Sequence, residues 1–164
     1  MTEFARRSAR VIVLDAADRL LLIRSAAEPD HPGSSYAWFT PGGGVEAGEE
    51  LAAAAARELL EETGLRADPA GLRPVAFAIG QADLGWASGL FRDDFFLHRV
   101  DRHRVDPAGM LDYERRHYGG HRWWTQAELE ATTEVIIPAA LVTLVADLIA
   151  GRLPATPVAL PWPP

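Results

Sequence analysis

The chain has 164 residues, a length that suits a single domain able to bury a hydrophobic core. Its formal net charge is −7, so it offers no broad basic field to a nucleic-acid polymer, and we expect no such partner. It contains no cysteine, which excludes a disulfide framework, a thiolate nucleophile and a cysteine-based zinc site.

Membrane and secretory signals are weak in this sequence. The N-terminal segment carries arginines but lacks the apolar stretch and the cleavage site of a signal peptide. The longest apolar run, residues 136–150, is interrupted by Pro138 and Asp147 and falls short of a membrane span. We therefore expect a cytoplasmic protein without a membrane partner.

The first elements are predicted to be strands. Residues 10–15 and 19–25 are rich in leucine and β-branched residues, and a tight turn joins them. Two prolines and a glycine predict a loop over residues 26–35. Residues 36–40 form a short aromatic strand that leads into the glycine run at residues 42–44.

A helix is predicted from about Glu49 to Thr63, with Gly64 as the residue that ends it. Glu58, Glu61 and Glu62 stand at i, i+3 and i+4, so they share one face of this helix. Like charges at this spacing repel one another, and a divalent cation would neutralise them. The residues expected to bury against the sheet lie on the opposite face: Ala52, Ala56, Leu59 and Leu60.

The second half of the chain alternates irregularly between strands and helices. Residues 74–81 and 90–100 are predicted strands, joined by a polar connection over 101–120 to a short strand at 121–124. A helix with a capping box starts near Thr125. This order favours an α/β fold, a mixed β-sheet with helices on both faces.

The C-terminal part is predicted to hold one more helix and an extended tail. Residues 138–150 form a mostly apolar helix that Gly151 ends. Five prolines in the thirteen residues of 152–164 predict an extended tail after a single domain at 1–151. We expect this tail to lie on its own domain or to complete a homodimer, with Trp162 as its anchor. Docking of another protein is the alternative.

The spacing of the glutamates and glycines resembles the signature of the Nudix hydrolases, the MutT-like family, which is G-x5-E-x7-R-E-U-x-E-E-x-G-U with U a bulky aliphatic residue. The matching residues are Gly43, Glu49, Arg57, Glu58, Leu59, Glu61, Glu62, Gly64 and Leu65. No defined position departs from the pattern. The resemblance implies the α/β/α sandwich of that family over about residues 9–151.

The resemblance also implies a metal site. Its ligands to Mg²⁺ or Mn²⁺ would be Glu58, Glu61, Glu62 and the carbonyl of Gly42. Glu61 would also belong to the catalytic set with Glu49 and Arg57, and Arg57 lies at i, i+4 to Glu61, where it can hold that carboxylate. The alternative interpretation of the helix is an acidic face that only contacts solvent.

The general base is not fixed by the signature. Some Nudix relatives carry a carboxylate just before a tryptophan, but the matching residue here is Arg122. Glu114 and Asp112 are therefore the candidates for the general base, and a glutamate of the signature helix is another. His117 and His121 are lesser options.

The aromatic candidates for holding a nucleobase are Tyr36, Trp38, Phe39 and Trp86, of which Trp38 is preferred. Arg24 is the arginine proposed to bind substrate.

The predicted reaction is hydrolysis of a nucleoside diphosphate linked to another moiety. The first candidate substrate is a canonical or oxidised nucleoside triphosphate. ADP-ribose or another nucleoside-diphosphate sugar is the alternative, although the proline typical of many such relatives is replaced by Gly80. The tyrosine of dinucleoside polyphosphate hydrolases is also absent, since Ala82 and Asp83 occupy that region. A non-catalytic module that senses a nucleotide is the alternative of another class.

Overall fold

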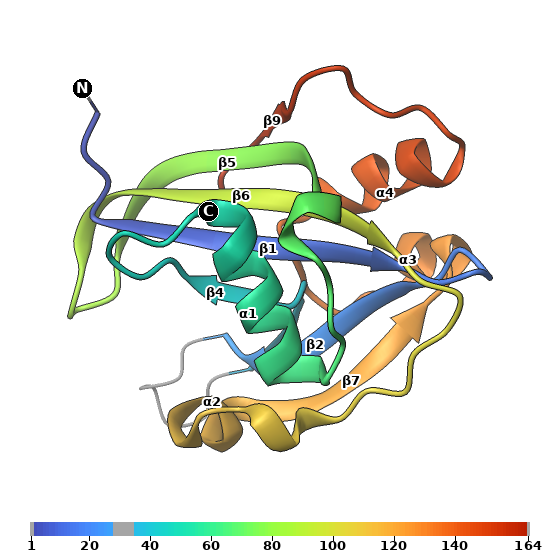
Figure 1. Ribbon diagram of the computed structural model, residues 1–164, viewed down its shortest axis with the longest axis horizontal. Coiled ribbons are helices and arrows are strands. Elements are labelled where there is room, and N and C mark those ends of the chain that lie inside the picture. The colour runs from blue at the N-terminus through green and yellow to red at the C-terminus, as the bar shows by residue number, and fades with distance from the viewer. Residues whose placement is uncertain (1, 28–34, 164) are drawn as a thin grey trace.

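A single β-sheet forms the centre of the molecule (Figure 1). The computed structural model describes residues 2–27 and 35–163, so most of the predicted loop at 26–35 lies outside the described residues. Within the described residues the sheet has nine strands. They are β1 (Arg6–Leu14), β2 (Leu20–Ala26), β3 (Tyr36–Phe39), β4 (Gly42–Gly44), β5 (Arg73–Asp83), β6 (Ser88–Arg99), β7 (Tyr118–Trp124), β8 (Ile136–Ile137) and β9 (Val158–Leu160).

The sheet is mixed and divides beside β1. Its main order is β8-β3-β2-β1-β6-β5-β9, with β1–β6, β3–β8 and β5–β9 parallel. The Leu14–Leu20 register joins β1 to β2 at one end. Nearer its start, β1 pairs instead with β4, while β7 pairs with β2. One half of the sheet (β2, β3, β7 and β8) therefore separates from the other (β1, β4, β5, β6 and β9) around the start of β1.

Helices cover both faces of the sheet (Figure 1). The helix α1 (Leu51–Thr63) packs on one face, and α3 (Gln126–Ala131) and α4 (Leu141–Ile149) pack on the other. A short helix, α2 (Asp112–His117), lies near β7. Strand residues alternate between two apolar clusters, one under α1 and one under α3 and α4. This arrangement is the predicted α/β/α sandwich with a mixed sheet.

Two helix ends follow the predicted chemistry. Gly64 ends α1 in the left-handed region at φ 73°, and its N–H donates to the carbonyl of Leu60. At the start of α3, the Thr125 side chain accepts from the Glu128 N–H while the Glu128 side chain accepts from the Thr125 N–H. The capping box is confirmed.

None of the helices in the described residues is long and apolar enough to cross a membrane.

Two expected loops contain regular structure. The glycine run forms β4, which pairs with β1. Glycine permits this close approach, because a Cβ at Gly42 would lie 2.5 Å from the carbonyl oxygen of Ala9. The polar connection at 101–120 holds a 3-10 turn, η2 (Pro107–Gly109), then α2 and the first residues of β7. Local capping stabilises the start of η2, because the Asp106 carboxylate accepts from the N–H of Ala108.

The C-terminal tail is extended and adds β9 to the edge of β5. Trp162 then lies directly on Gly80, where an added Cβ would stand 2.0 Å from its Cγ. Its ring also makes an edge contact with Phe91, with centroids 6.3 Å apart. The glycine at position 80 thus provides the space that the tryptophan fills.

The Trp162–Gly80 contact predicts a coupled loss of stability. We expect Trp162→Ala to lower the free energy of unfolding by about 2 kcal/mol, since a large half-buried ring loses its contacts. Gly80→Ala should cost a similar amount by displacing the ring, and the double variant should cost no more than either single change. Urea unfolding measures all three variants, with Val158→Ala as the control. Additive losses would contradict the contact.

Candidate metal-binding active site

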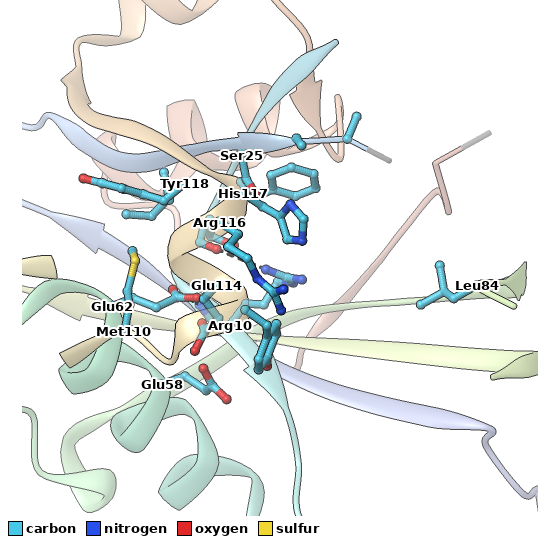
Figure 2. A pocket seen from close by; sticks show the side chains of 18 of the residues that line it. Arg10, Ser25, Glu58, Glu62, Leu84, Met110, Glu114, Arg116, His117 and Tyr118 are labelled. Carbon is cyan, nitrogen blue, oxygen red and sulfur yellow. Dashed lines mark hydrogen bonds between the residues drawn. The ribbon is translucent and has the colours of Figure 1, made fainter. Parts of the chain in front are cut away.

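A large cavity opens where the two halves of the sheet separate (Figure 2). Its volume is about 1290 Å³. The strands β1, β2 and β4, the helices α1 and α2 and the β5–β6 hairpin all contribute lining residues. Glu58 and Glu62 from α1 enter it on one side, Glu114 and His117 from α2 on another, and Leu84 of the hairpin marks its far end.

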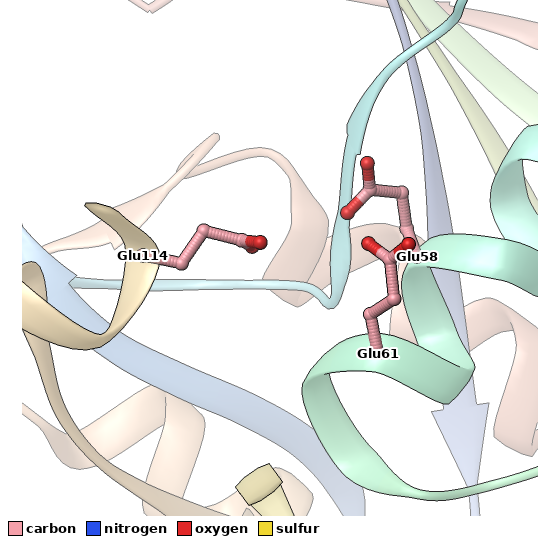
Figure 3. A group of neighbouring side chains, drawn as sticks. All are labelled: Glu58, Glu61 and Glu114. Carbon is pink, nitrogen blue, oxygen red and sulfur yellow. The ribbon is translucent and has the colours of Figure 1, made fainter. Parts of the chain in front are cut away.

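Three carboxylates meet at this cavity (Figure 3). Glu58, Glu61 and Glu114 each place one oxygen so that all three lie within 4.8 Å of one another. Glu58 is buried and the other two are half-buried. Hard divalent cations such as Mg²⁺ and Mn²⁺ prefer such oxygen donors, so this set of ligands fits the metal that the signature implies.

Glu114 reaches the signature helix because η2 packs tightly against it. Gly109 lies so close that an added Cβ would stand 2.9 Å from the backbone oxygen of Glu61. The Asp106 N–H donates to the carbonyl of Thr63 at 2.9 Å, which fixes the same segment to the end of α1. The Glu114 carboxylate accepts from the N–H of Leu111 at 3.3 Å.

The glycine loop lies directly over the carboxylates. The Gly42 N–H donates to the Glu62 carboxylate at 2.9 Å, so the contact that the structure records is through the amide of Gly42. A Cβ on Gly43 would lie 2.6 Å from Cδ of Glu58. Glycine is therefore required at position 43 for this close approach.

Arg57 organises the carboxylates around it. Its Nε and Nη2 donate to the two oxygens of Glu49 at 2.8 and 2.9 Å, and its Nη1 donates to Glu58 at 2.9 Å. Nη2 also donates to the carbonyl of Gly44 at 3.0 Å. The expected contact with Glu61 is the longest, at 3.5 Å, so Arg57 holds Glu49 and Glu58 more than Glu61.

The acidic groups divide electrostatically into two kinds. The hydrogen bonds from Arg57 lower the pKa of Glu49 to about 2. The same hydrogen bonds raise the pKa of Arg57. Burial instead raises the pKa of Glu58 and of Glu62. The supporting carboxylate is thus favoured in its charged form, whereas burial disfavours the charged forms of Glu58 and Glu62, a cost that a cation would offset.

The buried face of α1 differs from the prediction. Ala54, Ala55 and Leu59 are fully buried, while Ala56 and Leu60 are only partly buried. Because Ala54 and Ala55 lie beside Glu58 on the helix, the buried face includes part of the carboxylate side. The small alanines let α1 approach the sheet closely, so Glu58 is held between the helix and the glycine loop.

The structure places Trp38 and Arg24, the two expected substrate contacts, away from the cavity. Trp38 is 7% exposed and packs edge-on against Trp124 in the core under α3 and α4, and its Nε1 donates to Glu134. The guanidinium of Arg24 lies 4.2 Å from the ring centroid of Tyr36. Neither residue lines the cavity.

Among the candidates for the general base outside the signature helix, His117 lines the cavity with Glu114. Asp112 is exposed and lies outside the cavity lining. His121 is exposed, and its ring is bonded to the hydroxyl of Tyr118 at 2.8 Å. Arg122 pairs with Glu128 and stacks on Trp124, which accounts for the arginine at that position.

Two arginines of the site were missed by the sequence analysis. Arg6 and Arg10 lie on the same face of β1 and line the cavity, with Arg116 of α2 as a third cation. The prediction started this strand at residue 10, so the alternation of residues 6, 8 and 10 was not seen. A strand extended back to Arg6 would have placed both arginines on one face.

Comparison with known proteins supports the motif. A family model described as NUDIX domain matches residues 5–144. The chain belongs to the NUDIX family. The predicted membership is confirmed, and it covers most of the sandwich described above.

Individual relatives match shorter parts. Diphosphoinositol polyphosphate phosphohydrolase 2 of Rattus norvegicus is 47% identical over 49 residues, 30% of this chain and 24% of that protein. RNA pyrophosphohydrolase of Azorhizobium caulinodans is 37% identical over 54 residues, 33% of this chain and 32% of that protein. The matches thus span a third or less of these curated relatives.

A solved structure shares the whole fold. The NUDIX domain of Shewanella oneidensis NrtR, crystallised with ADP ribose, has a TM-score of 0.65 and 13% identity. The match covers 91% of this chain and 90% of that one.

The contact between the glycine loop and Glu58 predicts a selective metal defect. Gly43→Ala should displace Glu58 and weaken Mn²⁺ binding by about 10- to 100-fold, as expected for a residue that orients a ligand. Gly44→Ala is the matched control, because its Cβ would meet nothing nearer than 3.8 Å. Isothermal titration calorimetry measures the affinity, and circular dichroism checks the fold. Equal effects of the two substitutions would contradict the prediction.

The raised pKa values of Glu58 and Glu62 predict that metal binding releases protons. Carboxyl groups with raised pKa values keep their protons at low pH, and the cation needs them ionised. Mn²⁺ affinity should therefore keep rising with pH above the ordinary pKa of a glutamate, about 4.3. Calorimetry in two buffers of different ionisation enthalpy counts the protons. Glu58→Gln should bind Mn²⁺ weakly at every pH. An affinity independent of pH would contradict this expectation.

Proposed function

We propose that the chain is a metal-dependent pyrophosphohydrolase that cleaves a nucleoside diphosphate linked to another moiety. The first candidate substrate is a canonical or oxidised nucleoside triphosphate. One observation carries the proposal: Glu114 of a distant segment meets Glu58 and Glu61 of the signature helix beside a cavity that Glu58, Glu114, Arg6 and Arg10 line.

Each residue has a role in this reaction. Glu58 and Glu61 would hold Mg²⁺ or Mn²⁺, together with Glu62. The bound cation supplies charge neutralisation for the diphosphate and lowers the pKa of a water molecule. Arg57 and Glu49 keep the carboxylates in place through their paired hydrogen bonds. These two residues are positioning residues, since they touch the ligands and not the substrate.

Glu114 is the proposed general base. As a water oxygen forms its bond to phosphorus, Glu114 accepts the proton and the P–O bond of the anhydride breaks, with its electrons leaving on the bridging oxygen. Arg6, Arg10 and Arg116 stabilise the charge on the phosphate oxygens. Glu114 qualifies by position: its carboxylate lies with those of Glu58 and Glu61, where it would accept the proton of a water held beside them.

The alternative substrates would need different groups in the cavity. The printed name of one relative refers to diphosphoinositol polyphosphate, a substrate without an aromatic base. Phe39, Trp86 and Tyr113 line the cavity here, which favours a nucleotide. ADP-ribose or another nucleoside-diphosphate sugar stays the second substrate, since ADP ribose is the ligand crystallised with the NrtR domain. A purely sensing module has no need of the complete carboxylate set.

The remaining proposals concern the compartment, the partner and the oligomeric state of the protein. We keep the cytoplasm as its compartment and a small-molecule nucleotide as its partner. A homodimer stays a prediction.

A substrate screen with matched variants tests the proposal. Phosphate or diphosphate release from a panel of nucleotides is measured with Mg²⁺. Glu61→Gln should abolish turnover, because the amide loses the charge that holds the cation. Glu114→Gln should lower kcat by about 10²- to 10⁴-fold, the usual contribution of a general base. Asp112→Asn, two residues away but outside the cavity, is the control and should retain activity. No turnover of any substrate, or turnover that survives Glu61→Gln, would contradict the function.

A further inference from the structure

The cavity is larger than a diphosphate and its metal require. Its volume of about 1290 Å³ exceeds the roughly 300–1,000 Å³ that is usual for small-molecule sites. The carboxylates lie at one side, and the lining continues to the tip of the β5–β6 hairpin through Asp83, Leu84 and Trp86 (Figure 2). The distant part of the cavity is therefore available to another portion of the ligand.

Exposed apolar side chains gather around this cavity. Trp86 is 68% exposed, Tyr113 57% and Leu84 43%, and all three line it. Large apolar groups left in contact with water often mark a binding surface. A tryptophan ring offers a flat, rigid face to which another aromatic ring can stack.

Arg6 connects this ring to the phosphate-binding side. Its guanidinium lies 5.5 Å from the centroid of Trp86. Burial and the neighbouring Arg10 lower the pKa of Arg6, which shows two cations held close together. Arg10 also pairs with Asp93 at 3.6 Å and donates to the carbonyl of Thr40. Within residues 2–27 and 35–163, no carboxylate forms a salt bridge with Arg6.

We propose that Trp86 is the platform on which the aromatic base of the substrate stacks, and that Arg6, in contact with that ring, binds the substrate's phosphate oxygens. This inference rests on the proposed function, because it names the recognition element of the same cavity. It explains why an exposed tryptophan lies together with an arginine that forms no salt bridge among the described residues. The ligand chemistry is a nucleobase joined to a chain of phosphates.

The two residues should separate base recognition from phosphate recognition. Trp86→Ala should raise the KM for a nucleoside triphosphate by roughly tenfold or more, the effect of losing one base–aromatic stack, with kcat within about twofold. The same variant should lose much less affinity for inorganic tripolyphosphate, which has no base. Trp86→Phe should keep most of the affinity. Arg6→Gln should weaken the binding of both compounds.

Binding is measured separately from turnover. Calorimetric titration of the wild type and each variant uses a methylene-bridged nucleoside triphosphate and inorganic tripolyphosphate, with Val135→Ala as an exposed apolar control outside the cavity. A loss of affinity in Trp86→Ala that is confined to the nucleotide supports the proposal. An unchanged nucleotide affinity, or equal losses for both compounds, overturns it. Binding that depends on Trp86 without any turnover would overturn the proposed reaction and leave this site standing. A wild type that binds no nucleotide overturns both.

Discussion

The close approach of the glycine loop to Glu58 is the constraint on which the site depends. With no side chain at Gly43, β4 can lie against the carboxylate while pairing with β1 on its other side. Arg57 then bridges Glu49, Glu58 and the carbonyl of Gly44. Loop, helix and sheet are thereby fixed to one another at the point where the negative charges collect. A cation there would relieve both the repulsion and the burial of these charges.

The chemistry of the site and the choice of substrate belong to different parts of the fold. Carboxylates on α1 and Glu114 on α2 form one side of the cavity, whereas Trp86 and Leu84 come from the tip of a hairpin. Arg6 and Arg10 on β1 lie in the lining that both sides share. If Trp86 recognises the base as proposed, the signature helix carries little information about what is bound.

The signature helix and the general fold could be predicted from the sequence because they rest on local signals. Helical spacing, the glycine at position 64 and the capping box at Thr125 each act within a few residues. Glu114 was a candidate only by its residue type. What brings it to the metal site is the packing of Gly109 on the backbone of Glu61, a long-range contact with no local signal. The burial of Trp38 has no local signal either, since an aromatic strand residue has the same pattern whether it faces a core or a ligand.

The central claim is that Glu58 and Glu61 of the signature helix hold one divalent cation. Anomalous diffraction from crystals soaked in Mn²⁺ tests it most directly, because the signal locates the ion without reference to activity. The account predicts an anomalous peak within about 2.0–2.6 Å of carboxylate oxygens from these residues, beneath the glycine loop. A peak bound only at other acidic residues, or no peak in this cavity at Mn²⁺ concentrations that support turnover, would contradict it.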